Sequence, residues 1–157
     1  MKVVKRSGRV EDVKFDKVTN RISKLTYDPY DISQAVDASM IAQQVFSSIY
    51  EGISTQEIDT LSAEICSGMI TRDPDYEILA TRIIASNIQK TVPETFHTSM
   101  KKLNEAGIIT DEVVEIASVV SDKIIPTRDF DFGYFGLKTL ERSYLQKLHG
   151  RVMETPQ

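Results

Sequence analysis

Two short valine-containing segments open the chain and predict a β-hairpin. Val3–Val4 and Val10–Val13 flank Ser7-Gly8, and short strands joined by an X-Gly turn are typical of a tight hairpin. A lone two-stranded hairpin is marginally stable in water, so it must pack on something else. We therefore expect the hairpin to lie as a lid on a larger body.

A helical period of apolar residues follows the hairpin. Val18, Ile22 and Leu25 recur at i, i+4 and i+7, which predicts an amphipathic helix. Asp16 is a favourable N-cap residue, so we expect the helix to begin there. Because proline disfavours helical backbone in the residue before it, the helix should end before Asp28-Pro29.

Two further helices are predicted in the next part of the chain. The first should run over residues 33–50, with Gly52 as its C′ residue. The second should begin with a capping box formed by Ser54 and Glu57. The predicted apolar faces are Ala38, Ile41, Val45 and Ile49 in the first helix, and Ile58, Leu61, Ile65 and Met69 in the second. Cys66 lies among apolar neighbours, so we expect it in the core.

A fourth helical pattern begins after Asp73-Pro74, where proline suits a first turn. Pro93 should kink or restart this helix, which then continues to about Asn104 and ends at Gly107. The predicted fold is therefore mainly α, with an N-terminal β-hairpin lid over an approximately four-helix bundle.

The remaining residues form a second predicted segment. We expect a short helix over 111–120, an aromatic loop over 128–136 and a final helix over 137–148. Within the loop, Arg128, Asp129 and Asp131 suggest a surface ion-pair cluster, and the aromatic residues suggest a packing plug. The last residues carry no termination signal, so we expect that the natural protein continues beyond them.

Composition narrows the class of protein. Apolar residues make up 41% of the chain and charged residues 27%, which are ordinary values for a globular domain. No apolar run approaches the length of a membrane span, and no apolar signal core follows the N-terminal cations. The single cysteine excludes an internal disulfide, and with only two histidines we expect no metal site. These features favour a cytoplasmic protein.

Charge is distributed unevenly along the chain. Residues 1–24 hold eight Lys and Arg residues against three Asp and Glu residues, although the whole chain has a net charge of −4. The pattern admits three interpretations: a protected strand edge, a phosphate site, or a nucleic-acid arm. Lys5, Arg6 and Lys17 converge on one point if the hairpin folds over the following helix. From pattern alone, Thr55 reads as a cap residue, and Asp59 and Lys90 read as surface charges.

Three stretches of the sequence resemble a known family. "VVKRSGRVEDVKFDKV" (3–18) resembles the opening of the ATP-cone, the regulatory nucleotide-binding domain of ribonucleotide reductase large subunits. Residues 52–90 resemble the later helices of the cone, and "RDFDFGYFGLKTLERSYL" (128–145) resembles the stretch that follows it in class I enzymes. The resemblance implies a cone over residues 1–92 and the helical start of the reductase N-terminal domain over 93–157.

The resemblance also implies a set of binding residues. Lys5, Arg6 and Lys17 match positions that contact the phosphates of the nucleotide, and Thr55 and Asp59 match positions that approach its sugar and phosphates. Lys90 matches a basic residue that faces the same pocket. The stretch that encloses adenine corresponds to Glu11, Asp12, Val13, Lys14, Phe15, Asp16 and Lys17.

The function implied by this resemblance is allosteric. The family binds ATP as activator and dATP as inhibitor, with Mg²⁺, and thereby controls deoxyribonucleotide synthesis. Implied partners are the small, radical-generating reductase subunit and further copies of the chain that contact cone surfaces; no membrane or nucleic acid is expected. Catalytic residues of the family lie beyond this sequence, so the chain alone should not reduce ribonucleotides. The alternatives are a nucleic-acid-binding module built on the basic hairpin and an interaction domain that has lost its ligand.

Overall fold

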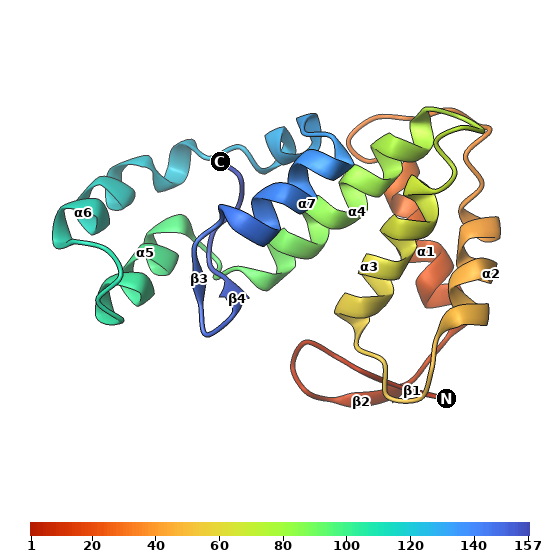
Figure 1. The fold of residues 1–157 in the computed structure, drawn as a ribbon, viewed down its shortest axis with the longest axis horizontal. Coiled ribbons are helices and arrows are strands. Elements are labelled where there is room, and N and C mark those ends of the chain that lie inside the picture. The colour runs from red at the N-terminus through yellow and green to blue at the C-terminus, as the bar shows by residue number, and fades with distance from the viewer. The chain divides into compact units, whose positions relative to one another are not determined.

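The structure is a computed structural model that describes residues 1–157. It is mainly helical, with seven α-helices, two short 3-10 helices and two antiparallel strand pairs (Figure 1). The chain divides into two compact units, Met1–Asn87 and Ile88–Gln157. The first unit contains an N-terminal hairpin and the helices that follow it, which confirms the predicted fold class.

The N-terminal hairpin is present as predicted and is anchored beside the start of α3. Strand β1 spans Lys2–Val4 and β2 spans Val10–Asp12, paired antiparallel with Val3 opposite Glu11. Gly8 in the turn has a φ of +81°, which glycine adopts without steric penalty. The Val4 amide donates to the Ile53 carbonyl at 3.0 Å, and the Gly52 amide donates to the Lys2 carbonyl at 2.9 Å. These bonds fasten β1 to the segment before α3 (Figure 1).

Helix α1 spans Phe15–Tyr27 and buries Val18, Ile22 and Leu25 as predicted. The predicted N-cap at Asp16 is wrong, because Lys14 holds the N-cap position and makes no side-chain cap bond. The Phe15 ring packs edge-on against Phe46 with centroids 5.3 Å apart, so packing between helices holds Phe15 at the start of the helix. Asp16 lies in the first turn, where the positive end of the helix dipole stabilises its negative charge. The helix ends before Asp28, as predicted.

Helix α2 spans Ala38–Ser48, so the predicted start at Ser33 is wrong. Asp37 is the N-cap, and its carboxylate accepts hydrogen bonds from two amides of the first turn. Ser33 is held outside the helix because its amide donates to Asp75 at 2.6 Å and its hydroxyl donates to Asp73 at 3.0 Å. Gly52 is not the predicted C′ residue; it adopts a positive φ in the later turn before α3.

Helix α3 spans Thr55–Ser67 and begins with the predicted capping box. The Glu57 amide donates to the Ser54 hydroxyl at 3.1 Å, and the Ser54 amide donates to the Glu57 carboxylate at 2.8 Å. Cys66 is fully buried as predicted, and this burial raises the pKa of its thiol to about 12. The predicted apolar face is only partly right, because Leu61 and Ile65 are half-buried. The buried residues of α3 are Ile58, Asp59, Ser62, Ala63 and Cys66.

Helix α4 spans Asp75–Thr91 and contains a fully buried arginine that the sequence pattern did not predict. Nη1 of Arg82 donates to the Leu25 carbonyl at 2.8 Å and to the Tyr30 carbonyl at 2.9 Å. The guanidinium carbon lies 4.3 Å from the centre of the Tyr30 ring. Arg82 therefore ties the end of α1 and the following loop to α4.

The second unit contains a pair of helices followed by shorter elements. Its elements are α5 (Phe96–Glu105), α6 (Asp111–Val120), η1 (Ser121–Lys123), η2 (Pro126–Asp131), α7 (Tyr134–Ser143), β3 (Lys147–Leu148) and β4 (Arg151–Val152). The restart after Pro93, the positive φ of Gly107 and the helix over 111–120 agree with prediction. Met100, Leu103, Ala117 and Met153 form a buried cluster between α5, α6 and the C-terminal segment.

The predictions for residues 128–148 need correction. Asp129 is fully buried and its Oδ2 accepts a hydrogen bond from Gln89 at 2.8 Å, so it is not part of a surface cluster. Of the loop aromatics only Tyr134 is buried, whereas Phe132 and Phe135 are exposed. The final helix ends at Ser143, and a β-hairpin follows whose turn contains His149 and Gly150, both with positive φ.

The division between the two units lies within α4, between Asn87 and Ile88. The predicted domain boundary after residue 92 stays a prediction. No helix of the structure is both long enough and apolar enough to cross a membrane.

Candidate functional site

Three hairpin and helix cations meet at one carboxylate, that of Glu11. Its Oε2 lies 3.2 Å from the Lys17 ammonium and 3.5 Å from the Lys5 ammonium, and Arg9 pairs with Oε1. The Arg9 and Lys17 hydrogen bonds lower the pKa of Glu11 to about 2. We call these four residues the Glu11 cluster. Lys5 and Lys17 come together as the basic pattern predicted, because the hairpin lies against the start of α1.

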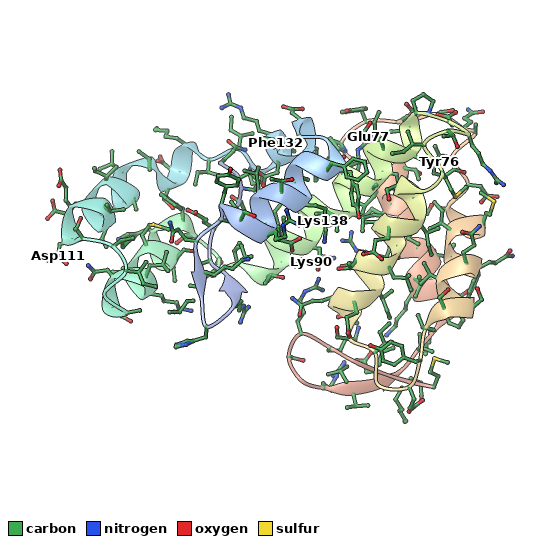
Figure 2. The ribbon with its side chains drawn as sticks, viewed as in Figure 1. Tyr76, Glu77, Lys90, Asp111, Phe132 and Lys138 are labelled. Carbon is green, nitrogen blue, oxygen red and sulfur yellow. The ribbon has the colours of Figure 1, made fainter.

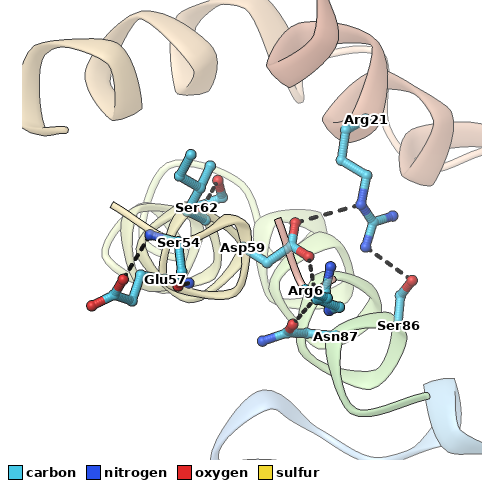
Figure 3. A network of polar contacts seen from close by, with 9 residues as sticks. Arg6, Arg21, Ser54, Glu57, Asp59, Ser62, Ser86 and Asn87 are labelled. Carbon is cyan, nitrogen blue, oxygen red and sulfur yellow. Dashed lines mark hydrogen bonds and ion pairs between the residues drawn. The ribbon is translucent and has the colours of Figure 1, made fainter. Parts of the chain in front are cut away.

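A second cluster surrounds the Asp59 carboxylate on α3. Asp59 is only 6% exposed, and its Oδ2 lies 3.1 Å from Nη2 of Arg6, which comes from the hairpin turn. Its Oδ1 lies 3.4 Å from Nε of Arg21 on α1. Figure 3 shows both guanidinium groups directed at this one side chain. The predicted surface role of Asp59 is therefore wrong.

Both arginines of this second cluster also reach α4. Nη2 of Arg21 donates to the Ser86 hydroxyl at 2.9 Å, and Nη2 of Arg6 donates to the side-chain oxygen of Asn87 (Figure 3). We call Arg6, Arg21, Asp59, Ser86 and Asn87 the Asp59 cluster. It joins the hairpin turn, α1, α3 and α4 through side chains.

Arg21, Ser86 and Asn87 were not predicted from the sequence. Arg21 carries a signal that would have found it, because it follows Lys17 by one helical turn and thus lies on the same face of α1. Ser86 and Asn87 are two of several polar positions in α4, and nothing local indicates which side chains they meet. The two clusters are neighbours, since Lys5 adjoins Arg6 and Lys17 precedes Arg21 by one turn.

The stretch predicted to enclose adenine has mixed surroundings. Asp12 forms an exposed ion pair with Lys2 at 3.1 Å, and the Val13 amide donates to the Met1 carbonyl at 3.0 Å. The Lys14 carbonyl caps the first turn of α1, and Phe15 and Asp16 lie at the exposed start of that helix. Only Glu11 and Lys17 of this stretch belong to the Glu11 cluster. A role of the stretch in holding a base stays a prediction.

Thr55 and Lys90, the two other predicted residues, are not members of either cluster as defined above. Thr55 is the first residue of α3, one turn before Asp59. Lys90 lies three residues beyond Asn87 on α4 and belongs to the second unit (Figure 2). The roles of Thr55 and Lys90 in binding stay predictions.

The combined charge of the clusters suits an anion. Lys5, Arg6, Arg9, Lys17 and Arg21 face the carboxylates of Glu11 and Asp59, which leaves a surplus of three positive charges. Arginine and lysine bind phosphate oxygens through strong, charge-assisted hydrogen bonds. No group of three or more His, Cys, Asp or Glu side chains is placed to hold a metal ion. The arrangement is suited to binding a polyanion.

Comparison with known proteins gives a consistent result. The profile of the ATP cone domain family matches residues 1–91. The whole chain is 41% identical to ribonucleoside-diphosphate reductase large chain 2 of Saccharomyces cerevisiae, and 99% of it is 43% identical to the large subunit of Caenorhabditis elegans. The large subunit of Arabidopsis thaliana is 42% identical over the whole chain. The matched region is 19% to 21% of these relatives, so the chain spans about a fifth of their length.

Proposed function

Because this chain belongs to the ATP cone domain family, we propose that it is the allosteric nucleotide-binding region of a ribonucleoside-diphosphate reductase large subunit. In this proposal ATP acts as activator and dATP as inhibitor. The observation that carries it is the joining of Lys5, Arg6 and Lys17, from two elements, into adjacent ion-pair clusters. A solvated strand edge would not need a buried carboxylate such as Asp59 beneath it.

The surplus charge fits a nucleoside triphosphate. The triphosphate carries about three to four negative charges near neutral pH, against the surplus of three positive charges in the two clusters. Its phosphates compete with Glu11 for Lys5 and Lys17, since all are anions that bind the same ammonium groups. The cations are thus held together before the nucleotide arrives, which lowers the cost of ordering them.

The proposed Mg²⁺ has no ligand set in these clusters. Glu11 and Asp59 are the carboxylates of the site, and each is already paired with cations. These residues do not fit a protein-held magnesium site, so a magnesium ion would be carried by the nucleotide phosphates.

Regulation requires that the two nucleotides favour different states of the protein. ATP and dATP differ only by the 2′-hydroxyl group, and a ligand that binds two states equally shifts neither. In this proposal the readout is assembly with further copies of the chain and with the small subunit of the cytoplasmic enzyme. In this proposal, the reduction itself is carried out by other parts of the whole reductase.

Calorimetric titration of the 157-residue chain with ATP and dATP tests the proposal. We expect saturable binding of both, and a thermal midpoint that rises with nucleotide concentration because ligands that bind only the folded state stabilise it. Lys5→Ala and Lys17→Ala should each weaken binding about tenfold, since each removes a charged phosphate contact. Lys24→Ala is the matched control, because Lys24 lies on α1 and pairs only with exposed Asp28.

Other outcomes identify the alternatives. Binding of duplex DNA that falls steeply with salt, without nucleotide binding, would favour the nucleic-acid module. A folded chain that binds neither nucleotide at millimolar concentration would favour the interaction domain and overturn the proposal.

A further inference from the structure

Two arginines share one buried carboxylate in the Asp59 cluster, although one would neutralise it. Arg6 lies 3.1 Å from Oδ2 and Arg21 lies 3.4 Å from Oδ1 of Asp59 (Figure 3). Both arginine side chains are about one-quarter exposed, whereas the Asp59 side chain is 9% exposed. The trio therefore carries one positive charge in excess.

The two arginines differ in how firmly the fold holds them. Arg21 lies in the middle of α1, next to Ile22, which is buried in the core. Arg6 lies in the turn between β1 and β2, whose cross-turn bonds are made by Lys5 and Arg9 on either side of it. A change in the position of Arg6 needs only a movement of this turn, whereas moving Arg21 would disturb a packed helix.

Removing every cationic partner from Asp59 would cost a large amount of free energy. A buried charge that loses its only partner is strongly destabilised, because nothing replaces the lost hydration. If Arg6 were the sole partner of Asp59, transfer of Arg6 to a phosphate would carry this penalty. Arg21 removes the penalty because it stays beside Oδ1 and is itself held by Ser86 at 2.9 Å.

We propose that Arg21 is a positioning residue for nucleotide binding, the fixed counter-ion of Asp59 that allows Arg6 to turn from Asp59 to the phosphates. This inference rests on the proposed function, because it needs a phosphate ligand for Arg6. Arg21 does not touch the nucleotide in this mechanism; it acts through Asp59.

A double-mutant cycle in the 157-residue chain tests the inference. dATP affinity is measured by calorimetry for the wild type, Arg21→Gln, Asp59→Asn and the double variant. We expect Arg21→Gln to weaken binding about tenfold or more, because Arg6 is then needed by Asp59. In the Asp59→Asn background the same substitution should change affinity less than about twofold, because no buried charge is left to compensate.

Two further variants separate charge from structure. Arg21→Lys should recover most of the affinity that Arg21→Gln loses, since it restores the positive charge beside Asp59. Lys24→Gln, one turn further along α1, should bind dATP within about twofold of the wild type, because its partner Asp28 is exposed.

Nuclear magnetic resonance of the wild-type chain gives a readout that needs no variant to fold. On addition of dATP we expect the Nε–H signal of Arg6 to shift and that of Arg21 to stay near its original position. Equal loss of affinity in both backgrounds, unchanged affinity of Arg21→Gln, or a large shift of the Arg21 signal would each overturn the inference. A wild-type chain that binds no nucleotide would instead overturn the proposed function on which it rests.

Discussion

The Lys17 ammonium donates a hydrogen bond to the Glu11 carboxylate at 3.2 Å, which joins strand β2 to the first turn of α1. Lys5 on the other side of the hairpin lies 3.5 Å from the same carboxylate. These charges thus hold the hairpin against α1, and its backbone bonds to residues 52–53 hold it to the segment before α3. The same cations are the proposed phosphate ligands. Nucleotide binding and the attachment of the hairpin to α1 therefore depend on the same groups.

The Glu11 cluster should make the free energy of unfolding depend on pH under acidic conditions. The pKa of Glu11 is lowered to about 2 from its ordinary value of 4.5, chiefly by Arg9 and Lys17. A carboxylate with a depressed folded-state pKa stabilises the fold above its ordinary pKa, and this contribution is lost as pH falls toward 2. Urea unfolding at pH 2 to 6 should therefore show the wild type losing stability more steeply than Glu11→Gln. Parallel curves for the two proteins would contradict this assignment.

Asp129 should have the opposite pH dependence. Burial raises the pKa of this carboxyl, and its Oδ2 accepts a hydrogen bond from Gln89 at 2.8 Å. An acid with a raised folded-state pKa destabilises the fold as pH rises above its ordinary value. Asp129→Asn keeps the acceptor for Gln89, so we expect the variant to gain thermal stability relative to the wild type between pH 4 and 7. Asp122→Asn, at an exposed acid of the same unit, should not show this gain.

Arg82 should contribute strongly to stability although it has no acidic partner among its hydrogen bonds. Arg82→Ala leaves the Leu25 and Tyr30 carbonyls without their donor and opens a cavity in the core. We expect a loss of about 3–5 kcal/mol in the free energy of unfolding, measured with urea. Arg72→Ala removes an exposed arginine that only approaches the Met40 sulfur, and should cost about 0.5 kcal/mol or less. Equal losses would show that the buried hydrogen bonds of Arg82 contribute little.

Removing the N-cap side chain of α2 should lower stability less than removing Arg82. Asp37→Ala removes the acceptor for two amides of the first turn, and should lower the free energy of unfolding by about 1 kcal/mol. Lys14→Ala changes the N-cap residue of α1, which makes no side-chain cap bond, and should have little effect. A comparable loss from Lys14→Ala would mean that capping is not the cause.

Local patterns predicted most of the helices because their causes act over a few residues. The capping box of Ser54 and Glu57 and the proline at position 29 each constrain the backbone of their own turn. Predictions failed where a distant contact determined a boundary. Ser33 was expected inside a helix, but Asp73 and Asp75 hold it outside, and Phe46 holds Phe15 at the start of α1.

The candidate site shows the same division. The sequence predicted that Lys5 and Lys17 come together, because a hairpin that folds over the following helix places them close in space, and they meet at Glu11. Arg6, predicted to join them, pairs with Asp59 instead. The sequence pattern assigned Asp59 to the surface and passed over Arg21 and Asn87. These residues meet only because α1, α3 and α4 pack with particular faces in contact.

The sequence by itself determined the fold class, the hairpin, some of the helix ends and the residues that resemble a nucleotide site. Only the tertiary structure decided which charges pair, that Arg82 and Asp129 are buried, and that two arginines share Asp59. The physical reason is the range of each interaction. Caps, turns and hydrophobic periods depend on neighbours within a few positions, whereas the burial of a charge depends on which helix faces pack together.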